Sequence, residues 1–136
     1  MGDIVLLRKD KFFAYQLAVV VDDQHQQINH VLRGSDLLDS TPRQLFLQRQ
    51  LGYPPPNYAH IPVITNSQGQ KLSKQTFAKP LNSSDATGNL TAALAFLKQP
   101  APPPRATVEQ IIDWAIAHWS IAAIPARTHI YTPDAE

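Results

Sequence analysis

Two lysines and a serine lie close together in a five-residue run, Lys71-Leu72-Ser73-Lys74-Gln75, which follows a predicted turn at residues 66–69. Each lysine ammonium supplies three hydrogen-bond donors and a full positive charge, and the serine hydroxyl lies between them. Such groups can stabilise the negative charge of a triphosphate. Taken alone, the run is also typical of a solvated surface turn. It predicts a phosphate-binding loop only if other segments indicate the same site.

Charged side chains follow two short apolar runs. Asp22 and Asp23 come directly after residues 18–21, and Arg33 with Gly34 ends the run at 30–33. In an open parallel sheet, ligands bind outside the carboxyl ends of the strands. The planar fork of Arg33 suits a carboxylate. We therefore expect Arg33 to bind an acidic group, and the hydroxyl of Tyr15 to hydrogen-bond a small polar substrate.

Each of these side chains also has a purely structural interpretation. Arg33 can form an ion pair with Asp36 or Asp39. Tyr15 can be a core tyrosine with a satisfied hydroxyl. The two aspartates after residue 21 can cap a strand end. The residues alone leave these alternatives open.

The composition is that of an ordinary globular protein. Of the 136 residues, 43% are hydrophobic and 17% charged, and the net charge of +1 excludes a broad basic surface. The absence of cysteine excludes disulfides and a thiolate zinc site within these residues. No apolar run approaches the roughly 20 residues of a membrane span. We expect a cytoplasmic protein with no membrane partner.

Short apolar runs predict strands in the front of the chain. The run at 18–21 is β-branched and apolar, which is typical of a buried parallel strand, although so short a run can also be a helical turn. Pro62 places the last run at an edge or strand start. The predicted strands are residues 4–8, 18–21, 30–33 and 61–64, with a turn at 9–11.

Capping patterns predict the helices. Thr41, Pro42 and Gln44 have the spacing of a capping box, and Gly52 followed by prolines ends that helix. Residues 90–97 have helical spacing, and a proline-rich spacer occupies 100–104. A second capping box, at 107–110, opens a helix with one apolar stripe. The stripe consists of Val108, Ile111, Ile112, Ala115, Ile116 and Trp119.

The order of several dispersed motifs resembles that of glutamyl-tRNA synthetases, which are class I enzymes. The Lys-Leu-Ser-Lys run is similar to their second signature loop. The similarity is greater to the short glutamyl-queuosine tRNA(Asp) synthetases, in the segment FAYQLA at 13–18 and in the form KLSKQ. The segments in the family's order are YQLAVVVDD (15–23), HVLRGSDLL (30–38), TPRQ (41–44), HIP (60–62) and KLSKQ (71–75).

This resemblance implies an α/β fold, namely the C-terminal half of a Rossmann-type catalytic domain followed by a small helical region. Residues 1–79 are expected to form the second half of the catalytic domain, and residues 80–136 the helical region. The family's first ATP signature and its zinc-binding insertion have no counterpart here. We therefore expect the isolated chain to be inactive, and to pair with a missing N-terminal half or to self-associate.

The resemblance also implies a reaction and its site residues. Glutamate and ATP, with Mg²⁺ expected, would give glutamyl-adenylate, and the glutamyl group would pass to the queuosine base of tRNA(Asp). Tyr15 and Arg33 resemble the glutamate-contacting residues. Lys74 resembles the lysine that contacts ATP, and Lys71 and Ser73 assist it.

Three aspartates are second-tier candidates for the substrate amine or for hydrogen bonds at the sheet edge: Asp22, Asp23 and Asp36. No residue is assigned to a metal. Two other functions remain open. The chain can be a non-catalytic module that binds tRNA or a partner, or part of a synthetase that charges tRNA(Glu). The early end of the chain and the KLSKQ form favour the queuosine enzyme.

Overall fold

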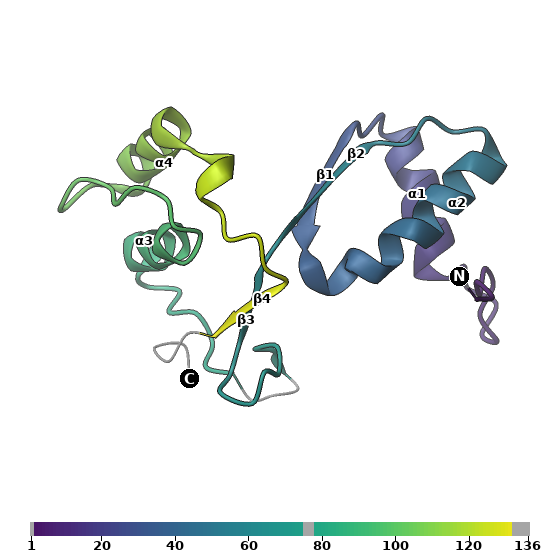
Figure 1. The fold of residues 1–136 in the computed structure, drawn as a ribbon, viewed down its shortest axis with the longest axis horizontal. Coiled ribbons are helices and arrows are strands. Elements are labelled where there is room, and N and C mark those ends of the chain that lie inside the picture. Colours follow the sequence, from purple (N-terminus) through teal and green to yellow (C-terminus); the bar gives the residue numbers. More distant parts are fainter. Residues whose placement is uncertain (1, 75–77, 132–136) are drawn as a thin grey trace. The chain divides into compact units, whose positions relative to one another are not determined.

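The computed structural model describes residues 2–74 and 78–131, and the chain divides into two compact units, residues 1–61 and 62–136. The first unit contains helix α1 (Tyr15–His25), strand β1 (His30–Gly34), helix α2 (Thr41–Leu51) and strand β2 (Asn57–Ile61). Helices α1 and α2 lie against each other (Figure 1). A 3-10 helix, Ser35–Ser40, joins β1 to α2.

Strands β1 and β2 pair in parallel, and the chain between them passes through α2, so this segment is a β–α–β unit. The predicted strand at 30–33 is confirmed. In this register Arg33 lies opposite His60, and Val31 lies opposite Tyr58. Because side chains alternate along a strand, these four residues share one face of the pair. Arg33 of the candidate site therefore lies on the same face as His60 and Tyr58.

The predicted strand at 18–21 is wrong, because these residues form the middle of α1. Its first turn is closed by bonds from Leu17 N and Ala18 N to Ala14 O, at 3.0 and 3.1 Å. Val20 is buried whereas Val21 is exposed, as expected when successive side chains point around a helix. A four-residue apolar run is too short to define a period. Asp22 and Asp23 therefore lie in the last turn of a helix and do not end a strand.

The residues before α1 also differ from the prediction. Residues 4–8 form no strand, and the described pairing is a single antiparallel bridge between Leu7 and Phe13. The predicted turn at 9–11 is confirmed by the 3.0 Å bond from Lys11 N to Arg8 O. A bridge between one pair of residues has no neighbouring hydrogen-bonded strand beside it, so it does not extend into a strand pair.

The start of α2 is not a capping box. Ser40 occupies the cap position but its side chain forms no capping hydrogen bond, and Thr41 is the first helical residue. The side chains of Thr41 and Gln44 bond the guanidinium of Arg33 instead of the helix backbone. Hydrogen bonds to a charged group are the stronger ones, which explains the difference. The predicted helix end is confirmed, because Gly52 adopts a φ of 71°.

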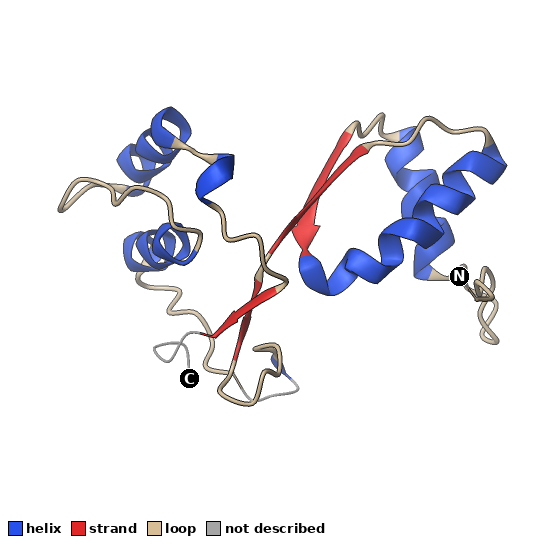
Figure 2. Ribbon diagram, in the orientation of Figure 1, coloured by secondary structure: helices blue, strands red, loops and turns tan. Residues whose placement is uncertain are grey.

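The second unit contains strand β3 (Val63–Thr65), helix α3 (Ala86–Phe96), helix α4 (Val108–His118) and strand β4 (His129–Tyr131), and β3 pairs in parallel with β4 (Figure 2). The capping box at the start of α4 is confirmed, with Thr107 and Gln110 bonding each other's backbone. A short 3-10 helix, Ile121–Ala123, follows α4. Both units are thus mixtures of helices and parallel strands.

The apolar core of each unit is small. In the described part of the chain, the buried hydrophobic core side chains are Val20 and Leu47 in the first unit, and Leu94 and Ile111 in the second. The predicted stripe on α4 is only partly buried, since Ile111 is 3% exposed but Ile116 is 75% exposed. The first unit also buries polar side chains, among them Gln44, which bonds Arg33.

Candidate functional site: a fixed guanidinium and a lysine-bearing hairpin

Arg33 lies near the carboxyl end of β1, where it is held by three hydrogen bonds. Its Nε bonds His60 Nε2 at 3.2 Å, its Nη1 donates to Gln44 Oε1 at 2.7 Å, and its Nη2 donates to Thr41 Oγ1 at 2.7 Å. The guanidinium carbon also lies 4.9 Å from the ring centre of Tyr58, within cation–π range. Arg33 is therefore fixed in both position and plane.

The three hydrogen bonds leave binding capacity on Arg33. A guanidinium has five N–H donors, and the described bonds use one on each nitrogen, so each terminal nitrogen retains one. All three acceptors are uncharged, and none of them is Asp36 or Asp39. A guanidinium that has an unused N–H group on each terminal nitrogen, and none of whose described hydrogen bonds goes to a carboxylate, can bind a carboxylate. Arg33 can thus bind an anion without breaking a described bond.

The side chains that contact Arg33, namely Thr41, Gln44, Tyr58 and His60, form a cradle around it. Further side-chain amides hold this cradle in place. Gln44 Nε2 donates to Gln16 Oε1 at 2.9 Å, and Gln16 Nε2 donates to Ser40 Oγ at 3.0 Å. This chain connects the first turn of α1 to the start of α2. Tyr15 precedes Gln16 and is exposed at the beginning of α1. The network therefore fixes the backbone next to Tyr15 in the unit that contains Arg33.

His60 takes part in the cradle through Nε2. This atom also lies 3.1 Å from Thr41 Oγ1. Because Arg33 donates to Nε2, that nitrogen must be the unprotonated one of the ring. Burial and then the Arg33 charge lower the pKa of His60. Geometry and electrostatics both favour the neutral imidazole.

The three second-tier aspartates occupy different positions in the first unit. Asp23 is half-buried and lines a small recess with Val20 and Gln48. Burial raises the pKa of Asp23; Arg33 lowers it and Asp22 raises it, by smaller amounts. Asp22 is exposed in the last turn of α1, and Asp36 is exposed in the 3-10 helix after β1. Asp23 interacts electrostatically with Arg33.

The lysine-bearing run lies in the second unit, where it follows a tight hairpin. Asn66 organises the turn, since its Oδ1 accepts from Gln70 N at 2.8 Å, and Gly69 adopts a φ of 76°. Lys71 pairs with Thr65 of β3 in an antiparallel bridge. This pairing attaches the start of the run to a strand.

Within the run, Leu72 N donates to Ile64 O at 3.0 Å, and Ala78 N donates to Ser73 O at 3.1 Å. Lys71 and Lys74 are exposed and Ser73 is half-buried. Gln75, the last residue of the predicted loop, lies outside the described residues. The ammonium groups are therefore presented on the surface of a strand-anchored loop.

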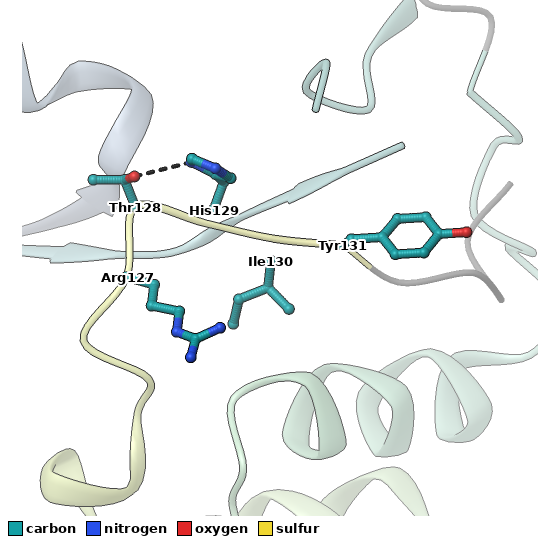
Figure 3. Close-up of a pocket in the computed structure, with 5 residues that line it drawn as sticks. All are labelled: Arg127, Thr128, His129, Ile130 and Tyr131. Carbon is teal, nitrogen blue, oxygen red and sulfur yellow. Dashed lines mark hydrogen bonds between the residues drawn. The ribbon is translucent and has the colours of Figure 1, made fainter. Parts of the chain in front are cut away.

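A hollow in the second unit is lined by Arg127, Thr128, His129, Ile130 and Tyr131. Figure 3 shows these side chains along one extended segment, with Thr128 Oγ1 bonded to His129 Nδ1 at 2.9 Å. Five consecutive residues, from β4 and the segment just before it, do not enclose a ligand. We therefore do not assign a site there.

The cradle around Arg33 was missed by sequence reasoning. Thr41 and Gln44 were predicted as helix caps, and Gln16, Tyr58 and His60 were not assigned to the site. The pairing is visible only in the structure, where the parallel register of β1 and β2 brings His60 opposite Arg33. That register cannot be derived from the strand predictions alone.

The comparisons with known proteins agree with this architecture. Residues 1–98 match the family model described as tRNA synthetases class I (E and Q), catalytic domain. The chain belongs to this family of class I tRNA synthetases. The predicted α/β class I catalytic fold is confirmed.

The curated relatives are more specific. A Glutamyl-Q tRNA(Asp) synthetase from Neisseria meningitidis is 49% identical over 133 residues, which are 98% of this chain and 45% of the relative. One from Dechloromonas aromatica is 51% identical over 135 residues, again 98% and 45%. The predicted similarity to glutamyl-queuosine synthetases is confirmed. The chain spans less than half the length of these relatives.

Two solved structures share the fold. A glutamate tRNA ligase from Elizabethkingia meningosepticum, in complex with its amino acid, superposes with a TM-score of 0.65 and 22% identity, covering 93% of this chain and 29% of that one. The glutamate-tRNA synthetase of Elizabethkingia anophelis gives 0.66 and 23%, covering 98% and 31%. In the described part of the chain no helix is long and apolar enough to cross a membrane.

Proposed function

We propose that this chain is part of an enzyme that activates glutamate with ATP and transfers the glutamyl group to the queuosine base of tRNA(Asp). The curated relatives that match nearly all of the chain are named for this activity. The observation that carries the amino acid assignment is the Arg33 guanidinium, which is held by uncharged acceptors with two N–H groups available. A carboxylate is the ligand that such a group binds best.

Arg33 holds the side-chain carboxylate of glutamate, with Tyr15 as a second contact. The α-carboxylate has to stay accessible, because it attacks the α-phosphorus of ATP. The bond from that phosphorus to the oxygen bridging to the β-phosphate then breaks, and pyrophosphate leaves. Binding the side chain with a fixed cation orients the α-carboxylate for this attack. Asp22, Asp23 and Asp36 are secondary candidates for the substrate amine.

Lys71, Ser73 and Lys74 contact the triphosphate, and Lys74 has the main role. Their positive charges and hydroxyl donor stabilise the charge that develops on the leaving pyrophosphate, with Mg²⁺ bound to the nucleotide. This role is electrostatic and positional, and needs no covalent intermediate with the protein. The exposed position of both lysines on the loop after β3 supports it.

The chain supplies only one part of the catalytic site. It spans about 45% of the length of its relatives, so we propose that residues 1–79 complete a catalytic domain together with a further segment. We propose residues 80–136 as an attached region, whose described part contains α3, α4 and β4. The chain alone is then inactive, and a non-catalytic binding module is the competing function.

The test is glutamate-dependent exchange of pyrophosphate into ATP. The chain is assayed alone and mixed with the segment of the Neisseria meningitidis relative that it does not match. We expect exchange only in the mixture, and loss of exchange with Lys74→Ala. The control Lys79→Ala removes another exposed lysine outside the run and is expected to keep the exchange. A mixture that lacks exchange but binds tRNA(Asp) would favour the binding module.

A further inference from the structure

Gln44 is fully buried, with 1% of its surface exposed. Its Oε1 accepts the 2.7 Å bond from Arg33, and its Nε2 donates the 2.9 Å bond to Gln16. Burial of an amide is tolerated when both of its ends are hydrogen-bonded. These two bonds fix the amide so that its oxygen, and not its nitrogen, faces the guanidinium.

Charge complementarity alone would select a different residue at this position. A buried or half-buried arginine is ordinarily paired with a carboxylate. Glutamate has nearly the same shape as glutamine and would accept the bond from Arg33 more strongly. It would also cancel the charge of Arg33 before any substrate arrives. The amide gives the same orientation without this cancellation.

The other side chains that bond or stack on Arg33 in the described contacts are uncharged as well. Thr41 contributes a hydroxyl, His60 a neutral imidazole, and Tyr58 the face of its ring. Asp23, in the last turn of α1, interacts with Arg33 electrostatically but accepts none of the three described hydrogen bonds of the guanidinium. The guanidinium is therefore fixed on three sides while it retains its charge.

We propose that Gln44 is a positioning and specificity-determining residue, whose neutral amide orients Arg33 without neutralising it, so that an acidic substrate supplies the missing negative charge. This inference rests on the proposed role of Arg33 in binding glutamate. Selection of L-glutamate over L-glutamine follows, because the isosteric amide of glutamine brings no charge to the fixed cation.

The test is Gln44→Glu in the full chain, with Gln50→Glu as the matched control. Gln50 is exposed on the same helix, so its variant makes the same change of charge away from Arg33. NMR titrations measure the binding of L-glutamate and L-glutamine, and a pH series measures the pKa of His60. Thermal unfolding verifies that each variant is folded.

We expect Gln44→Glu to weaken L-glutamate binding about tenfold or more. The introduced carboxylate pairs with Arg33, so the charge-assisted hydrogen bond between Arg33 and the substrate carboxylate is lost. Binding of L-glutamine should change far less. The pKa of His60 should rise, because the new carboxylate offsets the Arg33 charge that lowers it. Gln50→Glu should leave all three quantities at the wild-type values.

Unchanged L-glutamate affinity in Gln44→Glu, or an equal loss in Gln50→Glu, would overturn the inference. If wild type binds no L-glutamate even when mixed with the unmatched segment of the Neisseria meningitidis relative, the proposed function is contradicted. The titration of His60 then decides on Gln44, and an unchanged pKa of His60 in Gln44→Glu refutes its proposed role. If Gln44→Glu fails to fold, Thr41→Asp places a carboxylate beside the other terminal nitrogen of Arg33. For Thr41→Asp we expect the same loss of L-glutamate affinity and the same rise in the pKa of His60. Absence of both effects would overturn the inference.

Discussion

At the residue scale, Arg33 is a cation held firmly by neutral partners. Thr41, Gln44 and His60 each accept one hydrogen bond from it, and its guanidinium carbon lies over the ring of Tyr58. Each contact depends on the planar fork, which spreads its donors in fixed directions. Arginine is therefore required both for the proposed ligand and for the local structure.

Arg33→Lys tests this requirement. A lysine ammonium cannot reach three separated acceptors in one plane, and buried Gln44 Oε1 loses its partner. We expect the free energy of unfolding to fall by about 1–3 kcal/mol, the usual cost of an unsatisfied buried group. Urea unfolding measures it. The control Arg43→Lys, at an exposed position of α2, should stay within about 0.5 kcal/mol of wild type. An equally small effect of Arg33→Lys would contradict the cradle.

The neutral state of His60 predicts a dependence of stability on pH. Its pKa in the folded chain lies below the ordinary 6.5, so the unfolded chain takes up the proton first. The stability that comes from neutral His60 is fully present above pH 6.5, and is lost as the pH falls from there towards the lowered pKa.

Urea unfolding between pH 8 and pH 5, roughly 1.5 units either side of the ordinary histidine value, measures this loss. We expect a smaller pH dependence in His60→Gln, because glutamine accepts the bond from Arg33 without titrating. His30→Gln, at an exposed position of β1, is the control and should follow the wild-type curve. Identical curves for wild type and His60→Gln would show that His60 does not contribute.

At the element scale, signals that are local to a residue predict the structure, whereas short or ambiguous signals and those that depend on a distant partner do not. Gly52 ended α2 as predicted, because a left-handed cap is a local property of glycine. The strand at 18–21 failed because a four-residue apolar run fits a helix equally well. Thr41 was misassigned because its capping pattern is local, whereas its partner Arg33 is brought near by the β–α–β fold.

In the candidate site, too, the local signal was predictive and the contacts between distant residues were not. Arg33 was recognised from its position at the end of a strand, but its partners come from the register of β1 with β2 and from the packing of α1 on α2. Gln16 is 28 residues from Gln44, its hydrogen-bond partner. Contacts over such separations depend on tertiary structure, so residue patterns alone did not indicate them.

The capping box of α4 gives a prediction at this scale. Thr107→Ala removes the acceptor for Gln110 N and is expected to lower the free energy of unfolding by about 1 kcal/mol. Thr107→Ser keeps the hydroxyl and should restore most of the loss. Circular dichroism during urea unfolding measures both variants. Equal stability of Thr107→Ala and wild type would mean that the box does not stabilise the helix.

At the scale of the whole molecule, the units bury few apolar side chains, and large ones remain on the surface. Leu32 is 64% exposed on the face of β1 opposite to Arg33. The sheet that contains it has two strands, and each has an unpaired edge within the described residues. Exposed apolar residues on open edges favour association with another chain. We therefore expect the isolated chain to self-associate.

Leu32→Gln should reduce this association, because it replaces an exposed apolar side chain by a polar one while the Arg33 face stays intact. Analytical ultracentrifugation over a range of concentrations measures the distribution of species. Gln50→Ala, on an exposed face of α2, is the control and should leave the distribution unchanged. A wild-type chain that stays monomeric at all concentrations would refute the expectation.

The central claim is that the fixed guanidinium of Arg33 binds the carboxylate of an acidic amino acid. Its most direct test is an NMR titration of the chain labelled with ¹⁵N-arginine, following the side-chain signals of Arg33. We predict a saturable shift with L-glutamate and little shift with L-glutamine at the same concentration. Equal shifts with both amino acids, or no shift with L-glutamate, would contradict the claim.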